Sequence, residues 1–166
     1  IGYYQLIADR LAIEPDEEDA RDRGHRLEQE AINRFTKETK KEVETGLFCI
    51  SDINPNIAVS PDGLIQKDGI YIEAVEIKCL SDSRHIEAIL SYDIPLDYWH
   101  QVLQYFIVIE TLEKLNLVYY SDRIPSASYK VFEVYRKDIQ EEVDNYKDIE
   151  INMLKEIDSI ITKLAF

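Results

Sequence analysis

The sequence predicts a mixed α/β fold in which a central mixed or antiparallel sheet is flanked by helices. Three observations support this class. Helical patterns stand at both ends of the chain, short strand patterns separated by turns fill the middle, and 45% of the 166 residues are hydrophobic. A chain of this length and composition can bury one core, so we expect a single domain over residues 1–166.

Apolar residues at intervals of three and four predict the helices. A short helix is expected over residues 3–13, before a polar link through Pro15 and Asp16. A longer helix follows, with a core-facing stripe of Ala20, Leu27, Ala31 and Phe35. Two further helices are expected over residues 83–90 and 96–111, and the second is strongly amphipathic.

The last predicted helix is the longest and runs from about residue 137 to residue 164. Its apolar seam consists of Ile139, Val143, Tyr146, Met153, Ile157, Ile160 and Leu164. Glu150 interrupts this seam. Packing across the domain's own sheet is the first interpretation of the seam, and a contact between subunits is the second.

Extended segments separated by turns predict the strands. They cover residues 42–50, 57–60, 64–66, 70–79, 115–120 and 129–135. The first two are expected to pair as a hairpin, and the first four to form a meander. The segment IYIEAVEIKC has the strongest strand character, because it is rich in β-branched residues.

The charge of the chain excludes one class of partner. The sequence has 33 acidic residues and 19 Lys and Arg residues, and the net charge of −14 would repel a polyphosphate at long range. Indiscriminate coating of nucleic acid is therefore excluded. A local basic groove, or phosphate contacts made through divalent cations, agrees with this charge.

Cysteine content and hydropathy indicate the cellular compartment of the protein. Two cysteines, Cys49 and Cys79, are too few for a disulfide scaffold or a cysteine-rich metal site. No apolar stretch reaches the roughly 18 residues that a membrane span requires. The first residues also lack the pattern of a secretory signal. We therefore expect a soluble protein of a reducing, cytoplasmic compartment.

Residues 60–79, SPDGLIQKDGIYIEAVEIKC, carry charges in a segment that should otherwise be buried. Side chains alternate along a strand, so Glu76 and Lys78 share one face. Asp62 stands at a turn from which it can approach Glu76, and two carboxylates in a low-dielectric site repel each other unless a cation bridges them. Two carboxylates and the carbonyl of Ile77 suit Mg²⁺ or Mn²⁺ better than Zn²⁺.

Lys78 would lie beside such an ion. There it can orient or help deprotonate an attacking water and balance charge on a phosphate. The competing interpretation is an exposed cross-strand ion pair with Glu76, which is the common outcome for an isolated Glu-x-Lys triplet. The Pro-Asp-Gly turn upstream, an acid on a preceding helix and a glutamine on a following helix favour the metal site.

Three motifs carry a resemblance to a known family: SPDGL at residues 60–64, EIKC at residues 76–79, and Gln-Val-x-Gln at residues 101–104 after an aromatic residue. Over almost the whole chain, the sequence resembles the phage lambda exonuclease, or YqaJ-type viral recombinase exonuclease, family of the PD-(D/E)XK nuclease superfamily. The resemblance implies a restriction-endonuclease-like core and a deoxyribonuclease that uses two Mg²⁺ or Mn²⁺ ions. The implied reaction removes nucleotides from duplex DNA ends, 5′ to 3′, in phage-type recombination.

The resemblance assigns four acids and one carbonyl to the metals. Asp62 and Glu76, with the carbonyl of Ile77, would hold the main ion. Asp52 and Glu28 would serve a second ion or its waters. Glu28 stands at the family's spacing after an arginine-glycine pair, and Asp52 stands ten residues before Asp62. The alternatives are a solvated helix acid for Glu28 and a turn-initiating residue for Asp52.

The resemblance also assigns the residues that act on water and phosphate. Lys78 would activate the nucleophile, and Gln101 would position water or phosphate. Substrate phosphate contacts are implied for Ser60, Ser83 and Arg84. The alternatives are a packing role for Gln101 and a surface cation for Arg84.

The sequence departs from the family in two places. The stretch from Asp62 to Glu76 is a few residues longer and contains a second acid, Glu73. Glu73 lies three residues before Glu76 and should point to the other face, so Glu76 remains the expected ligand. The family's N-terminal portion, which supplies further phosphate contacts, is expected to be absent ahead of Ile1.

The resemblance implies three partners: duplex DNA ends, a single-strand annealing recombinase, and further copies of the chain in a homotrimer. Two other functions stay open. A structure-specific endonuclease is the alternative among enzymes, because the same metal chemistry serves either cut. A catalytically silent DNA-end-binding module is the alternative outside the enzymes, and the strong negative charge favours it.

Overall fold

The structure is a computed structural model that describes residues 2–14, 19–91 and 94–164, so the link through Pro15 and Asp16 lies outside the described residues. The helices are α1 (Tyr3–Leu11), α2 (Ala20–Thr39), α3 (Asp82–Ser91), α4 (Leu96–Val108), the 3₁₀ helix η1 (Pro125–Ala127) and α5 (Arg136–Leu164). The strands are β1 (Cys49–Ile50), β2 (Ala58–Val59), β3 (Gly63–Lys67), β4 (Ile70–Lys78), β5 (Lys114–Tyr120) and β6 (Tyr129–Tyr135). Each expected helix and strand has a counterpart, but the strand expected over residues 42–50 is reduced to Cys49–Ile50, and the helix expected over residues 96–111 ends at Val108.

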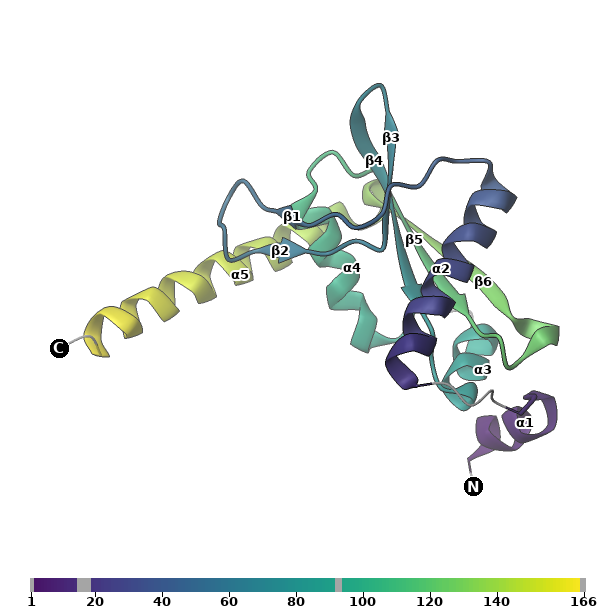
Figure 1. The fold of residues 1–166 in the computed structure, drawn as a ribbon. Coiled ribbons are helices and arrows are strands. Elements are labelled where there is room, and N and C mark those ends of the chain that lie inside the picture. The colour runs from purple at the N-terminus through teal and green to yellow at the C-terminus, as the bar shows by residue number, and fades with distance from the viewer. Residues whose placement is uncertain (1, 15–18, 92–93, 165–166) are drawn as a thin grey trace.

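The central sheet has the strand order β3-β4-β5-β6 (Figure 1). Strands β4 and β5 run parallel, and both outer pairs run antiparallel. The parallel pair requires a crossover, and α3 and α4 supply it between the two strands. The predicted class of a mixed sheet flanked by helices is confirmed.

The hairpin from β3 to β4 turns on two residues in the left-handed region. Asp68 has a φ of 53° and Gly69 a φ of 80°, and the pairing of Lys67 with Ile70 closes the turn. Asp-Gly is a preferred pair for such a two-residue hairpin turn, because it tolerates positive φ at both positions. Between this turn and Gly63 the register shifts by one residue at Ile65/Gln66, and the shifted pairing places Gly63 opposite Val75 and Asp62 beside the end of β4.

The predicted meander of the first four strands is wrong in one respect. Strands β1 and β2 pair antiparallel, as expected, but they form a separate two-stranded sheet. A single bridge, Glu44 to Leu64, joins the preceding segment to β3. Two-residue strands offer too few hydrogen bonds to extend the central ladder, so they stand apart from it.

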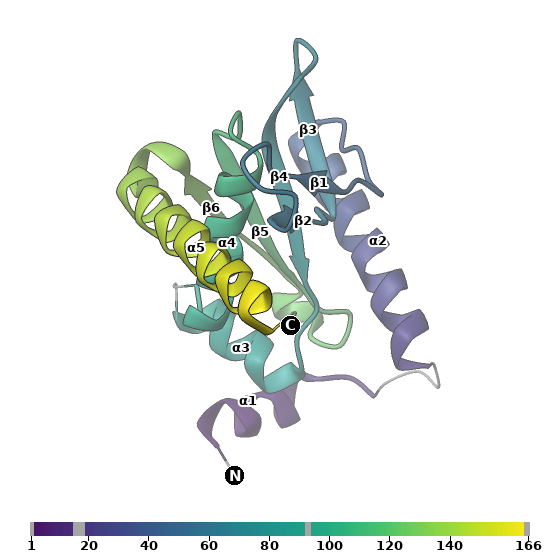
Figure 2. The same cartoon turned by 90° about the vertical axis from the view of Figure 1, so that its left-hand side faces the viewer.

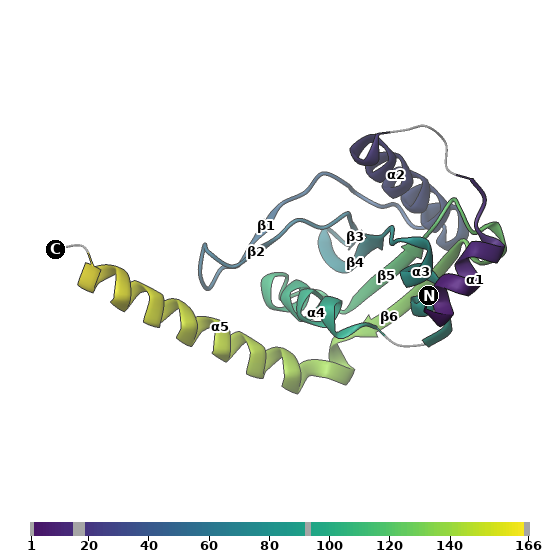
Figure 3. The same cartoon turned by 90° about the horizontal axis from the view of Figure 1, so that it is seen from below.

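Helices cover both faces of the central sheet. On one face, α2 contributes Ala31, Ile32 and Phe35 to a core with Val75 and Ile77 of β4. On the other face, α4 packs in a second core with residues of β3, β4, β5 and the start of α5. Figures 2 and 3 show α2 on one side of the sheet and α4 and α5 on the other. Residues on opposite faces of β4 therefore meet different helices.

Helix α5 packs on the domain from its beginning as far as Leu154, which with Tyr146 lies against the core that contains α4. Ile139 and Val143 are buried, whereas Met153 is 57% exposed and Leu164 is 76% exposed. The C-terminal half projects away from the body (Figures 1 and 3). Packing on the domain's own sheet therefore explains only the first part of the predicted seam. Within the described ranges no helix, α5 included, is long and apolar enough to cross a membrane.

Candidate active site

Strand β4 presents Glu76 and Lys78 on the face of the sheet that α4 covers. Lys78 Nζ lies 2.7 Å from Oε1 of Glu76, and their side chains are only 16% and 7% exposed. Val75 and Ile77 pack against α2 on the opposite face, as strand alternation predicts. The pair is therefore buried between sheet and helix, and the interpretation as an exposed surface ion pair is wrong.

Gln101 of α4 closes a three-residue cluster with this pair. Its Nε2 donates to Oε1 of Glu76 at 2.7 Å, and its Oε1 accepts from Lys78 Nζ at 2.7 Å. Lys78 Nζ also lies 4.9 Å from the centre of the Tyr98 ring, one turn earlier on the helix. The amide thus locks both charged groups in place, and Gln101 meets its two predicted neighbours instead of serving apolar packing.

Tyr105 is a site residue that the sequence analysis missed. Its hydroxyl donates a short hydrogen bond to Oε2 of Glu76, and its side chain is 1% exposed. Burial and the charge of Glu76 raise the pKa of this phenol, so Tyr105 stays a donor. The signal was present in the sequence, because residues four apart on a helix lie on one face and Gln101 and Tyr105 have that spacing.

Asp62 lies in the turn between β2 and β3 and reaches across to β4. Its Oδ2 accepts a hydrogen bond of 2.6 Å from the backbone N–H of Ile77, next to Glu76. Burial, the charge of Glu76 and the charge of Glu28 raise the pKa of the Asp62 carboxyl to about 7, although the Ile77 N–H and Lys78 oppose this. The predicted approach of Asp62 to Glu76 is present.

Lack of space explains why a glycine, Gly63, follows Asp62 in this turn. A Cβ atom at Gly63 would overlap Cγ1 of Val43 in the strand-like segment that follows α2. Its backbone φ lies outside the left-handed region, so space and not conformation requires glycine here. The close approach of the two segments holds Asp62 at the beginning of β3.

Glu28 projects from α2 toward the same place. Its charge contributes to the raised pKa of both Asp62 and Cys79, which places it near the two. Burial is the main cause that raises the pKa of the Cys79 thiol to about 12, so this cysteine stays protonated and is a poor metal ligand. The charge of Glu28 thus reaches Asp62, but among the described residues no hydrogen bond or ion pair joins Glu28 to Asp62 or Glu76.

Asp52 is not brought into this group. It is exposed on the connection between β1 and β2, and in the described part of the chain no contact links it to Asp62 or Glu76. Its role in a second metal site stays a prediction. Glu73 points elsewhere, as expected: Lys41 donates to it at 2.6 Å, and Lys114 lies 3.2 Å from it.

Of the residues implied for phosphate binding, Ser60 and Arg84 are exposed and Ser83 is half-buried. Ser60 is exposed, and its Oγ makes only a long contact of 3.5 Å with the Leu47 carbonyl. Ser83 and Arg84 stand in the first turn of α3. The guanidinium of Arg84 forms an exposed ion pair of 3.0 Å with Asp97, which a phosphate can displace at small cost.

The donor atoms fit a divalent cation. The charges of Glu76 and Glu28 both act on Asp62, and Lys78 is the cation bonded to Glu76. Oδ1 of Asp62 accepts no hydrogen bond from any described residue, and Oε2 of Glu76 accepts only one. Oxygen donors with excess negative charge suit Mg²⁺ or Mn²⁺. Across the described ranges, no group of three or more His, Cys, Asp and Glu side chains is arranged to hold a metal ion.

Comparison with protein families establishes the relationship of this chain. The family model of the YqaJ-like viral recombinase domain matches residues 4–111, which include every predicted site residue. The chain belongs to this family. A search of curated proteins found no match.

The YqaJ-like chain also resembles solved structures over nearly its whole length. An alkaline exonuclease, LHK-Exo, from Laribacter hongkongensis is 25% identical with a TM-score of 0.71, and the match covers 98% of this chain and 84% of that one. The structure of LHK-Exo in complex with dAMP matches with a TM-score of 0.70 and 24% identity, over 98% of this chain and 84% of that one. The fold is therefore of the PD-(D/E)XK type.

Proposed function

We propose that this protein is a metal-dependent DNA exonuclease that hydrolyses phosphodiester bonds at duplex ends, 5′ to 3′, in phage-type recombination. The observation that carries the proposal is the buried cluster of Glu76, Lys78 and Gln101 beside Asp62. Membership of the YqaJ-like family and the likeness to LHK-Exo, an alkaline exonuclease, support the same activity.

The carboxylates define where cations would be held. Asp62, Glu76 and the carbonyl of Ile77 would hold one Mg²⁺ or Mn²⁺, and Glu28 and Asp52 would serve a second. When bound, such cations supply positive charge to the scissile phosphate and make water more acidic. Asp62 must lose its proton to bind a cation, and the raised pKa of about 7 places this loss within the physiological range.

Lys78 is the residue that would meet the attacking water. Its ammonium group has three N–H donors, and Glu76 and Gln101 take two of them. The third remains for water or for a phosphate oxygen, where developing negative charge strengthens the hydrogen bond. Gln101 fixes the lysine so that this donor needs no reorganisation during the reaction.

Digestion of a linear duplex labelled at its 5′ end tests activity, metal need and polarity together. We expect labelled mononucleotide to be released early with Mg²⁺ or Mn²⁺ and not with chelator. Early release from a 3′ label would overturn the polarity. No release from either end in the presence of metal would overturn the nuclease proposal.

A covalently closed circular duplex separates the proposal from its rivals. An exonuclease leaves the circle intact and digests it only after linearisation. Cleavage of the closed circle would show an endonuclease instead. Binding of duplex ends without cleavage at any metal concentration would show a catalytically silent end-binding module.

The proposal extends to assembly as a homotrimer that encloses the DNA. A net charge of −14 opposes binding of a polyanion, and a closed ring replaces tight phosphate binding by topological enclosure. Lys78 and Arg84 would then face the channel. The C-terminal half of α5 offers the apolar surface for a subunit contact, since Met153, Ile157, Ile160 and Leu164 are between 43% and 76% exposed.

A further inference from the structure

One carboxylate joins α2 to the carboxyl end of β5. Oδ1 of Asp122 accepts a hydrogen bond of 2.8 Å from Arg23, and Oδ2 accepts one of 3.0 Å from Arg26. The three side chains are between 25% and 35% exposed, so these ion pairs are largely shielded from solvent. Although burial raises the pKa of Asp122, the two guanidinium groups lower it overall, so this carboxylate is charged at neutral pH.

The segment that carries Asp122 is itself held in place. Ser121 is 2% exposed, and its N–H donates to the Ser128 carbonyl at 2.9 Å. Its Oγ accepts a hydrogen bond of 3.2 Å from the N–H of Arg123, whose guanidinium pairs with Asp82 of α3 at 2.8 Å. Asp122 therefore stands on a fixed part of the chain, from which it can hold a helix.

Glu28 lies on the opposite flank of the same helix. Successive residues of an α-helix are rotated by about 100°, so Glu28 lies about 140° from Arg23 and about 200° from Arg26 around the axis. Helix α2 packs on both β4 and β5, whose carboxyl ends lie at the same edge because the two strands run parallel. The arginines meet Asp122 beyond β5, and the charge of Glu28 acts on Asp62 beside β4.

The first turns of α2 have little apolar packing that could fix their rotation. Of residues 21–28 only Leu27 is buried, and a Cβ added at Gly24 would meet no atom within 4 Å. The later turns supply the helix's part of the core on this face, through Ala31, Ile32 and Phe35. A single buried side chain leaves a helix free to turn about it, so other contacts must fix the rotation here.

Polar contacts hold the helix on both sides of Glu28 along the chain. After it, Tyr120 of β5 donates to Glu30 at 2.9 Å. Before it, Asp122 binds two side chains of the first turns. Glu28 itself accepts no hydrogen bond from any residue in the described ranges, so the backbone of α2 sets its direction.

We propose that Asp122 is a positioning residue of the candidate active site: through Arg23 and Arg26 it sets the rotation of α2 that directs Glu28 toward Asp62. The inference rests on the proposed function, in which Glu28 serves the second cation. Groups behind a metal ligand matter because they fix its direction and its affinity. Loss of the Asp122 charge would let the first turns of α2 rotate and would carry Glu28 away from the cation.

Calorimetry with Mn²⁺ on single and double variants tests this role. We expect Asp122→Asn to weaken the weaker of the two Mn²⁺ sites about tenfold and to leave the stronger one unchanged, as Glu28→Gln should do. The double variant should bind no more weakly than Glu28→Gln alone, because a residue that acts only through Glu28 has nothing left to position. Losses that add, or wild-type affinity in Asp122→Asn, would overturn the inference and leave the proposed function intact.

The same titrations show separately whether the proposed function fails. A wild type that binds one Mn²⁺ ion, or a Glu28→Gln protein with both wild-type affinities, would show that Glu28 serves no second cation. Either result would overturn that part of the proposed function and the inference with it. Arg23→Gln removes one of the two ion pairs at a side chain that is 28% exposed, and it serves if Asp122→Asn folds poorly. It should weaken the second site alone, and wild-type affinity would again overturn the inference.

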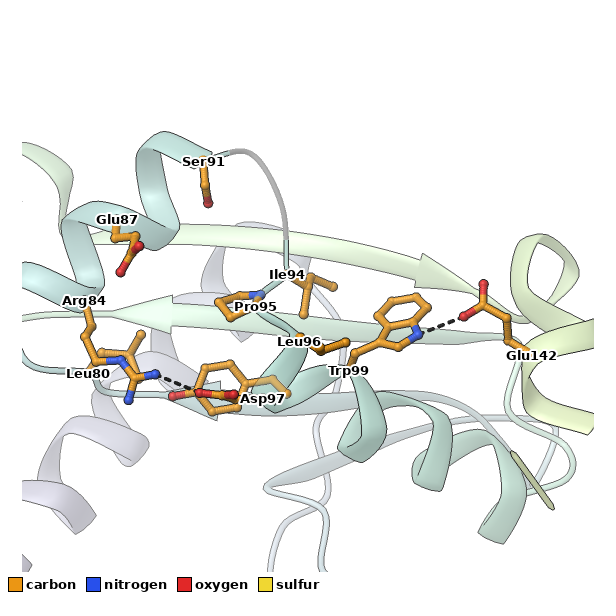
Figure 4. Close-up of a pocket in the computed structure, with 11 residues that line it drawn as sticks. Leu80, Arg84, Glu87, Ser91, Ile94, Pro95, Leu96, Asp97, Trp99 and Glu142 are labelled. Atoms are coloured by element: carbon orange, nitrogen blue, oxygen red, sulfur yellow. Dashed lines mark hydrogen bonds and ion pairs between the residues drawn. The ribbon is translucent and has the colours of Figure 1, made fainter. Parts of the chain in front are cut away.

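Glu142→Gln is the matched control on the other face of the sheet. Its carboxylate accepts the hydrogen bond of 2.8 Å from Nε1 of Trp99 that Figure 4 marks, and this bond joins α5 to α4. The variant loses a charged acceptor as Asp122→Asn does, but it should keep both Mn²⁺ affinities.

Hydrogen exchange in the absence of metal distinguishes release of α2 from a general loss of stability. In Asp122→Asn the backbone amides of residues 24–28 should exchange about tenfold faster than in the wild type, while those of β4 and β5 should keep their rates. Equal acceleration in the helix and in the strands, or no acceleration in the helix, would show that Asp122 does not fix the first turns of α2.

Discussion

The hydroxyl of Tyr105 donates a hydrogen bond to Oε2 of Glu76, one helical turn beyond Gln101, whose amide donates to Oε1 of the same carboxylate. Helix α4 therefore holds both oxygens of the buried acid. Groups that orient a metal ligand from behind usually matter almost as much as the ligand, because they fix its direction and its affinity. Tyr105 is in this sense a positioning residue.

Substitution Tyr105→Phe tests that role. It removes the hydroxyl and keeps the buried ring, so Glu76 loses one of its donors and its carboxylate becomes free to turn. We expect roughly a tenfold or greater loss of Mn²⁺ affinity and of cleavage rate, measured by calorimetry and by digestion of linear duplex. We also expect a loss of about 1–2 kcal/mol in the free energy of unfolding.

Tyr120→Phe is the matched control, because its hydroxyl bonds to Glu30 at 2.9 Å on the α2 side of the sheet. This variant should lose stability but keep wild-type Mn²⁺ affinity and cleavage. If the two variants reduce cleavage equally, Tyr105 does not position the carboxylate.

Substitution Lys78→Gln separates metal binding from chemistry. The glutamine can still donate to Glu76, but it carries no positive charge for the water and the phosphate. Cleavage should fall by about a hundredfold or more, while Mn²⁺ binding persists. Lys114→Gln serves as the control, because Lys114 pairs with Glu73 and Glu133 away from the cluster. Retention of more than about a tenth of the cleavage rate by Lys78→Gln would contradict the assignment.

Substitution Asp62→Asn should stabilise the metal-free protein at high pH. The Asp62 carboxyl has a pKa near 3.8 when the chain is unfolded and about 7 when it is folded, so the folded state binds this proton more tightly. The destabilisation by the charge is absent below about pH 4, grows as the pH rises from about 4 to about 7, and is fully present above pH 7. In chelator at pH 8, the variant should melt about 2–4 °C above the wild type, for a gain of about 1 kcal/mol.

Three comparisons test whether Asp62→Asn raises the melting temperature for the stated reason. At pH 4 the variant and the wild type should melt at similar temperatures, and at pH 8 Mn²⁺ should stabilise only the wild type. Asp122→Asn should act in the opposite direction. Although burial raises the pKa of Asp122, hydrogen bonds from Arg26 and Arg23 lower it overall. A metal-free Asp62→Asn protein that melts below the wild type at pH 8 would contradict the argument.

The shared face of Glu76 and Lys78 could be predicted because strand alternation is a local rule. The stripe of α2 could be predicted for the same reason, and Leu27, Ala31 and Phe35 are buried as expected. The contact of Asp62 with the Ile77 backbone depends on the register between β3 and β4, and no local pattern states that register. Tyr105 resembled a core residue because it is also one, with its ring in the α4 cluster.

In α5 the periodic pattern of apolar residues does not predict which of them are buried. The same spacing of apolar residues continues from Ile139, which is buried, to Leu164, which is 76% exposed. Periodicity identifies an apolar face but not what covers it. The domain's core contacts α5 as far as Leu154, so the described part of the chain leaves the apolar residues beyond it, Ile157, Ile160 and Leu164, exposed (Figure 3).

The last prediction concerns that face. In a trimer, Ile157 and Ile160 would be buried at a subunit contact, and they are 43% and 46% exposed in the single chain. Light scattering should give the wild type about three times the chain mass of 19.4 kDa at micromolar concentration. The double variant Ile157→Lys, Ile160→Lys should be monomeric, because two buried ammonium groups oppose the contact, and digestion should become distributive. A second double variant, Ser159→Lys with Thr162→Lys, adds the same charge at exposed positions of the same helix and should remain trimeric. A monomeric wild type, or dissociation by both double variants alike, would show that the apolar face of α5 does not join the subunits.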